Sequence, residues 1–269
     1  MYDSPAPALS APRADFIEAG TGPLVVLVHA SMSGARQWSS LSQALADRFR
    51  LRALNLFGYG RTPAWPAERP PSLDDYADLV VSAVPPGARD VTLIGHSVGG
   101  AVAMQAARRL GRQMAKLVLI EPSIFSLLES GGRSEAYAEI AAVADDMARL
   151  PPEQAAERFI GYWTGGASWA ATPPERKAAY VRAVDLVRHE FGAAFGSRTA
   201  LREWRASLPR RTLVIAAADT KRSSREVVEL LLPAGGGWEF ARVPDGGHMS
   251  PLTRPQIVNP IVAAYLEHP

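Results

Sequence analysis

Six short apolar runs, separated by stretches with helical periodicity, constrain the fold of this 269-residue chain more than any other feature. The runs consist mostly of apolar or β-branched residues, as expected of strands buried on both faces. Such strands favour a mostly parallel sheet that is covered by helices. The runs cover residues 23–28, 50–56, 90–95, 116–121, 211–218 and 238–243, and residues 14–20 are expected to add an antiparallel edge strand.

Helical patterns fill most of the gaps between these runs, which gives a repeated strand–helix order. This order predicts an α/β fold with a mostly parallel central sheet flanked by helices. A chain of this length is expected to form one main core. The predicted helices cover residues 34–48, 73–84, 98–111, 224–232 and 255–267.

One long segment interrupts the strand–helix rhythm. Residues 123–195 contain helical patterns, including 134–150 and 152–163, and no convincing strand. We therefore predict a core formed by residues 1–122 and 196–269, with a helical cap inserted between its two parts.

Composition excludes several classes of function. The formal net charge is only +2 and the basic residues are scattered, which argues against a nucleic-acid partner. The chain has no cysteine, so disulfides, thiolate metal sites and a thiol nucleophile are excluded. The histidines lack paired ligand spacing and "FGYGRT" lacks the spacing of a dinucleotide loop, so we expect neither a metal nor a cofactor.

The first residues of the chain and its hydropathy indicate where in the cell the protein is expected. The first sixteen residues lack a basic start followed by an apolar stretch, and no run of about 18 apolar residues occurs anywhere. We expect a cytoplasmic protein without a membrane span, either a monomer or a homodimer.

The segment "VTLIGHSVGG" places a serine between a buried strand and a helix, with glycines on both sides. Gly95 and Gly99 supply the clearance that a tight strand-to-helix turn requires around its central residue. The turn directs the Ser97 hydroxyl toward the carboxyl end of the sheet, beside a helix N-terminus that favours developing negative charge. Ser97 is therefore the candidate nucleophile.

A serine hydroxyl becomes a good nucleophile only when a base removes its proton. His248 lies in "PDGGHMSP", a loop that follows the last apolar run, and is the candidate base. The base needs an acid that fixes its tautomer. Asp219, directly after "TLVIAAA", is our first choice, and Glu121, at the end of "LVLIEP", is the alternative.

These residues together resemble the α/β-hydrolase family: the "GHSVGG" turn, the chain order Ser97, Asp219, His248 and the "GGHMSPLTRP" loop follow its pattern. The segment "VLVHASMSG" resembles the family's oxyanion loop, although Ala30 replaces the usual glycine. The resemblance implies that the backbone N–H groups of Ser31 and Val98 form the oxyanion hole. It also implies that His29 braces this loop and does not react.

The resemblance implies a serine hydrolase that cleaves a carboxylic ester or thioester through an acyl-enzyme. The large apolar residues of the inserted segment indicate a small to medium hydrophobic substrate. A C–C bond hydrolase, a lactonase, a cofactor-free perhydrolase or a non-catalytic small-molecule receptor would have a similar sequence. The expected partner is a small-molecule ester. The candidate pocket residues are Phe125, Leu128, Tyr162, Trp163 and Met249.

Overall fold

A computed structural model describes residues 13–66, 68–232 and 237–268 of the chain. In these ranges, seven strands form one sheet with the order β1-β3-β2-β4-β5-β6-β7. Only β1 runs antiparallel to its neighbour, β3. The predicted fold class is confirmed, and each predicted apolar run overlaps one strand, although β4 ends one residue later and β5 begins two residues earlier than predicted. The strands are β1 (Phe16–Ala19), β2 (Leu24–Val28), β3 (Arg50–Leu54), β4 (Val91–His96), β5 (Met114–Ile120), β6 (Thr212–Ala217) and β7 (Trp238–Val243).

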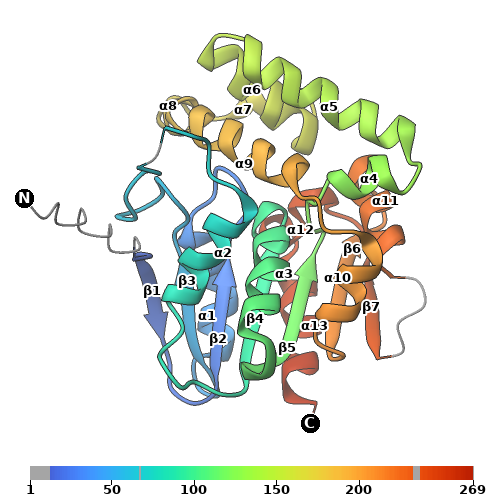
Figure 1. Ribbon diagram of the computed structural model, residues 1–269. Coiled ribbons are helices and arrows are strands. Elements are labelled where there is room, and N and C mark those ends of the chain that lie inside the picture. Colours follow the sequence, from blue (N-terminus) through green and yellow to red (C-terminus); the bar gives the residue numbers. More distant parts are fainter. Residues whose placement is uncertain (1–12, 67, 233–236, 269) are drawn as a thin grey trace, which may run out of the picture.

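Helices cover both faces of this sheet, which explains the continuous apolar runs (Figure 1). Val26 and Val28 of β2 pack into the apolar core on one face, and Val25 and Leu27 pack into the core on the other. Helices α2 (Leu73–Ser82), α3 (Val98–Leu110), α10 (Leu201–Ser207) and α11 (Arg222–Leu231) contribute to the first core. Helices α1 (Ser39–Leu45) and α13 (Pro255–Glu267) contribute to the second.

The segment between β5 and α10 contains only helices among its regular elements, and most of them lie above the carboxyl ends of the strands in Figure 1. We call these six helices the upper helices. They are α4 (Ser126–Ser130), α5 (Ser134–Arg149), α6 (Pro152–Thr164), α7 (Ala167–Ala171), α8 (Pro174–Arg182) and α9 (Val184–Gly196). Their apolar faces join the core that covers α2 and α3, so they pack as a continuation of that layer.

The remaining short elements lie in the connections between strands and helices. The 3-10 helix η1 (Ala35–Trp38) precedes α1, η2 (Gly111–Gln113) follows α3, and η3 (Gly247–Met249) with α12 (Ser250–Thr253) follows β7. None of the helices in the described ranges is both long and apolar enough to cross a bilayer.

Candidate active site

Ser97 occupies a strained turn between β4 and α3. Its φ of 57° lies in the left-handed region, which a residue with a side chain rarely adopts. The flanking glycines make the turn possible: a Cβ on Gly95 would lie 2.2 Å from the carbonyl oxygen of Gly99, and one on Gly99 would lie 2.3 Å from that of Val28. The turn presents the Ser97 hydroxyl at the carboxyl end of the sheet, where the sequence predicted it.

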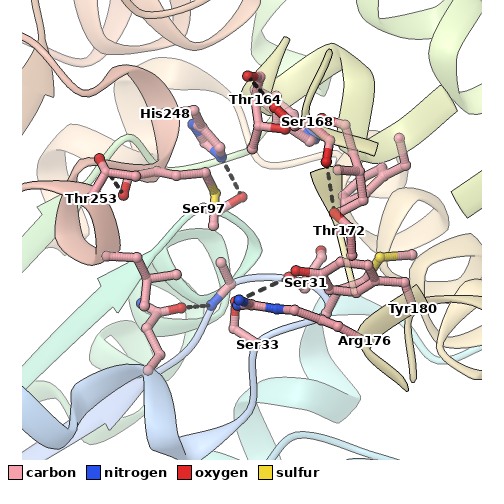
Figure 2. A pocket seen from close by; sticks show the side chains of 18 of the residues that line it. Ser31, Ser33, Ser97, Thr164, Ser168, Thr172, Arg176, Tyr180, His248 and Thr253 are labelled. Atoms are coloured by element: carbon pink, nitrogen blue, oxygen red, sulfur yellow. Dashed lines mark hydrogen bonds between the residues drawn. The ribbon is translucent and has the colours of Figure 1, made fainter. Parts of the chain in front are cut away.

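His248 lies on η3, after β7, and its imidazole contacts this hydroxyl (Figure 2). The Ser97 Oγ is 2.8 Å from the His248 Nε2, close enough for the hydroxyl to donate its proton to the ring. The indole of Trp163 on α6 stacks on the imidazole, with ring centroids 3.9 Å apart and planes inclined by 25°. His248 is only 2% exposed, so the contact between the imidazole and the hydroxyl lies largely out of bulk water.

The carboxylate that contacts His248 belongs to Glu121, the residue directly after β5. Its Oε2 lies 2.8 Å from Nδ1 of His248. The Glu121 side chain is fully buried, and it also accepts hydrogen bonds from the N–H of Ala217, at 2.8 Å, and from the Thr220 hydroxyl. These donors fix the carboxylate, and the carboxylate in turn fixes the Nδ1–H tautomer that leaves Nε2 free to accept a proton.

The expectation that Asp219 contacts His248 is wrong. Asp219 is exposed, and its carboxylate accepts the N–H groups of Gly246 and Gly247, at 3.3 and 2.9 Å. Asp219 therefore stabilises the turn that precedes His248. The acid that contacts the imidazole is the alternative, Glu121. Both carboxylates follow adjacent strands, so the sequence alone could not decide which of them reaches the ring.

His248 is also fixed through its backbone. Nε2 of His96 donates to the carbonyl of His248 at 2.7 Å, and the Gln37 side-chain amide donates to Nδ1 of His96 at 3.1 Å. Gln37 Oε1 accepts the N–H of Ala30 at 3.0 Å. Burial lowers the pKa of His96 to about 3, so it stays neutral and keeps these two roles. A chain of buried hydrogen bonds thus links the loop after β2 to the loop that carries His248.

His29 has the bracing role that the sequence predicted. Its Nδ1 donates to the carbonyl of Ala30 at 2.7 Å, and its Nε2 accepts the N–H of Leu56 at 3.1 Å. Burial lowers the pKa of His29 to about 4, so the ring is neutral near pH 7. The hydroxyl of Tyr59 accepts the N–H of Met32, which fixes the next turn of the same loop.

Ser31 and Val98 are the predicted oxyanion donors. Both border the space beside Ser97. Val98 is the first residue of α3, so its N–H has no carbonyl four residues earlier within that helix. Among the described residues, no acceptor is found for the N–H of Ser31 either. Both N–H groups are thus left without an acceptor by these contacts, and both residues border the cavity beside Ser97.

Two cavities open at Ser97. A larger one of about 470 Å³, the large pocket, lies between His248 and Met249 on one side and α6–α8 on the other. Figure 2 shows Ser97 and His248 across this pocket from Thr172, Arg176 and Tyr180. A smaller one of about 20 Å³, the inner chamber, lies between Ser31, Ser97 and Val98 on one side and Val187, Glu190 and Phe191 of α9 on the other.

Three of the five predicted pocket residues border these cavities. Met249 lines the large pocket, Phe125 lines the inner chamber, and Trp163 lines both. Leu128 and Tyr162 border neither cavity: Leu128 is fully buried in the core, and the Tyr162 hydroxyl bonds to Ser223 and Glu139. The helical apolar pattern is the same for residues that pack in the core and for residues that line a cavity. The sequence therefore could not show that Leu128 and Tyr162 belong to the first group.

Several residues at the site escaped the sequence analysis. Ser123 Oγ lies 3.1 Å from Ser97 Oγ, and Ser224 Oγ lies 3.1 Å from His248 Nδ1. Glu190, a buried acid on α9, borders the inner chamber. In residues 13–66, 68–232 and 237–268, no cluster of three or more histidine or acidic side chains could hold a metal ion.

The chain is similar to known proteins. A model described as "Alpha/beta hydrolase family" matches residues 25–261. The chain is 30% identical to an uncharacterised protein of Mycobacterium tuberculosis over 217 residues, which cover 73% of this chain and only 58% of that protein. It is 28% identical to the pimeloyl-[acyl-carrier protein] methyl ester esterase of Aromatoleum aromaticum over 256 residues, 87% of this chain and 94% of the other.

Solved structures show the same fold. The crystal structure of a hydrolase from Pseudomonas aeruginosa superposes with a TM-score of 0.73 over 94% of each chain, at 23% identity. The strand order, the turn at Ser97 between β4 and α3 and the family match agree, and the chain belongs to the alpha/beta hydrolase family.

Proposed function

We propose that the protein is a serine esterase in which Ser97, His248 and Glu121 act as nucleophile, base and orienting acid. The observation that carries the proposal is the unbroken hydrogen-bonded chain from Ser97 Oγ through the imidazole to the Glu121 carboxylate, with 2.8 Å at each step. The esterase from Aromatoleum aromaticum supports ester hydrolysis as the reaction class. The upper helices act as a cap over the nucleophile.

The first half of the reaction forms an acyl-enzyme. Ser97 Oγ attacks the ester carbonyl carbon while its proton passes to Nε2 of His248. The carbonyl oxygen becomes an oxyanion that accepts hydrogen bonds from the N–H groups of Ser31 and Val98. Each such donor contributes about 3 kcal/mol of transition-state stabilisation. The tetrahedral intermediate then collapses, the C–O bond to the alcohol breaks, and His248 returns the proton to the leaving alcohol.

The second half releases the acid. A water molecule gives a proton to His248 and attacks the acyl carbon, and the bond to Ser97 Oγ breaks as the proton returns to that oxygen. Glu121 keeps its hydrogen bond to Nδ1 and stabilises the imidazolium that forms in both halves. The reaction needs the triad, the oxyanion donors and water.

The two cavities suggest which part of the ester lies on which side. His248 must protonate the leaving oxygen, and His248 borders the large pocket. The alcohol part therefore occupies the large pocket. The acyl part, on the opposite side of the carbonyl carbon, extends into the inner chamber beneath α9. The small size of that chamber favours a short acyl group.

The proposal is tested with p-nitrophenyl acetate and a fluorophosphonate probe. The wild type is expected to hydrolyse the ester and to react covalently at Ser97. The Ser97→Ala variant should lose about four to six powers of ten in kcat and should not be labelled. Hydrolysis that persists unchanged in Ser97→Ala would refute the mechanism, and a folded wild type that neither hydrolyses nor labels would indicate a receptor.

A further inference from the structure

A buried acid of the upper helices borders the same chamber as Ser97, and the proposed reaction has no use for it. Glu190 on α9 is 2% exposed and borders the inner chamber together with Ser97, Ser31 and Val98. The rest of the α9 side of this chamber is apolar, formed by Val187, Phe191 and Ala194.

Glu190 interrupts an apolar helix face. Val187, Phe191 and Ala194 follow the helical spacing that faces a core, and Glu190 occupies the position between them on the same side. A glutamate at such a position costs stability, because burial removes water from a charged group. A residue that violates the local pattern in this way often marks a functional site.

The carboxyl of Glu190 lacks the partners that buried acids usually have. Neither of its oxygens makes a hydrogen bond of normal geometry with the described residues. The hydroxyls of Ser31 and Tyr59 are near enough to lower its pKa in part, but burial dominates and raises that pKa to about 7. No lysine or arginine is among the groups that shift this pKa, so no cation of the described residues neutralises the carboxylate of this chamber-lining residue.

We propose that Glu190 selects the acyl group, by hydrogen bonding to a hydroxyl on carbon 2 or 3 of a short hydroxyacyl ester. The inference depends on the proposed function, because the acyl group enters the inner chamber only if the leaving alcohol occupies the large pocket beside His248. A plain alkyl chain would cover the carboxyl and leave it unpaired, whereas a hydroxyl would satisfy it.

A hydroxyl fits this site better than other polar groups. A hydroxyl donates to an ionised carboxylate and accepts from a protonated carboxyl, so it pairs with Glu190 in either state. An ammonium group would require the ionised form alone, and an acyl chain that ends in a carboxylate would require the protonated form alone. The chamber of about 20 Å³ has room for roughly one water-sized group, so only the shortest acyl chains enter it without displacing its walls.

Matched pairs of esters test the proposal, with benzyl alcohol release as the readout. The substrates are benzyl lactate against benzyl propionate, and benzyl 3-hydroxybutyrate against benzyl butyrate. We expect the wild type to prefer the hydroxyacyl ester of at least one pair by about tenfold or more in kcat/KM. The ratio of two substrates does not depend on the fraction of enzyme that is folded.

Variants assign the preference to Glu190. Glu190→Leu should bring the ratio close to one by losing activity on the hydroxyacyl ester, and Glu190→Gln should keep part of the preference, because an amide also donates and accepts. Glu157→Leu, which removes an exposed glutamate from α6, should leave the ratio at its wild-type value.

The outcomes separate the two proposals. If the wild type hydrolyses the plain and hydroxylated esters of both pairs equally well, or if Glu190→Leu keeps the wild-type ratio, the role of Glu190 is refuted while a Ser97-dependent esterase remains. If no ester is hydrolysed in a Ser97-dependent manner, the proposed function fails and this inference fails with it.

Discussion

The imidazole of His248 stacks on the indole of Trp163, a residue of the upper helices, with ring centroids 3.9 Å apart. Through this contact α6 packs directly on the proposed catalytic base. Trp163 is itself 8% exposed, so it also contributes to the core between the upper helices and the sheet. The position of the upper helices and the position of the base are therefore coupled.

Removal of the stacked ring should affect both stability and activity. Trp163→Ala should lower the free energy of unfolding by about 3 kcal/mol, because it leaves a cavity. It should also lower kcat for p-nitrophenyl acetate by about tenfold or more, because His248 loses one wall of its site. Urea unfolding and steady-state kinetics measure the two effects. Trp65→Ala removes a half-buried ring elsewhere and should leave kcat unchanged; equal kcat values for the two variants would contradict the coupling.

The two carboxylates near the His248 loop should differ sharply in their effect on turnover. Glu121→Gln places an amide beside Nδ1 of His248 and disturbs the tautomer, so kcat should fall by roughly three to four powers of ten. Asp219→Asn keeps an oxygen that can accept from Gly246 or Gly247, so kcat should fall by less than about tenfold. The reverse order of effects would restore Asp219 as the triad acid.

The glycines of the chain should tolerate substitution very unevenly. A Cβ on Gly99 would lie 2.3 Å from the Val28 carbonyl oxygen, so Gly99→Ala should lower the free energy of unfolding by more than about 3 kcal/mol. Gly192 is exposed within α9, and a Cβ built on it would have no atom within 4 Å. Gly192→Ala should therefore raise the free energy of unfolding by about 1 kcal/mol. Thermal unfolding of the two variants checks the contrast, and a stable Gly99→Ala protein would disprove the close packing at the turn.

The stability of the protein should depend on pH through Glu190. Its pKa is raised from 4.5 to about 7 by burial, so the folded state binds this proton more tightly than the unfolded state. The resulting stabilisation is fully present below about pH 4.5 and is lost as the pH rises through about 7, by roughly 3 kcal/mol in total.

Comparison with Glu190→Gln isolates this effect from the other titrating groups. The free energy of unfolding of the wild type should fall relative to that of the variant from about pH 4.5 to about pH 8, in urea unfolding series. A difference between the two proteins that stays constant over this range would show that Glu190 titrates normally.

Much of the site follows from local sequence. The continuous apolar runs predicted the sheet, because helices cover both of its faces. The "GHSVG" segment placed Ser97 in the turn between β4 and α3, because only glycines fit where the turn packs on itself and on β2. The loop after the last run placed His248 at the same end of the sheet, and the ends of parallel strands meet at one edge.

Tertiary structure alone decided between the acids. Glu121 and Asp219 follow neighbouring strands and have equivalent sequence contexts, but only the packed structure turns Glu121 toward His248 and Asp219 toward the glycine turn. Glu190 can be noticed in the sequence, because it interrupts the apolar spacing of α9. The surface that α9 covers, however, depends on contacts between segments that are distant along the chain. Periodicity and turn chemistry are local properties and can be read along the chain. Long-range packing decides which distant residue a side chain contacts, and which cavity a helix from another segment borders.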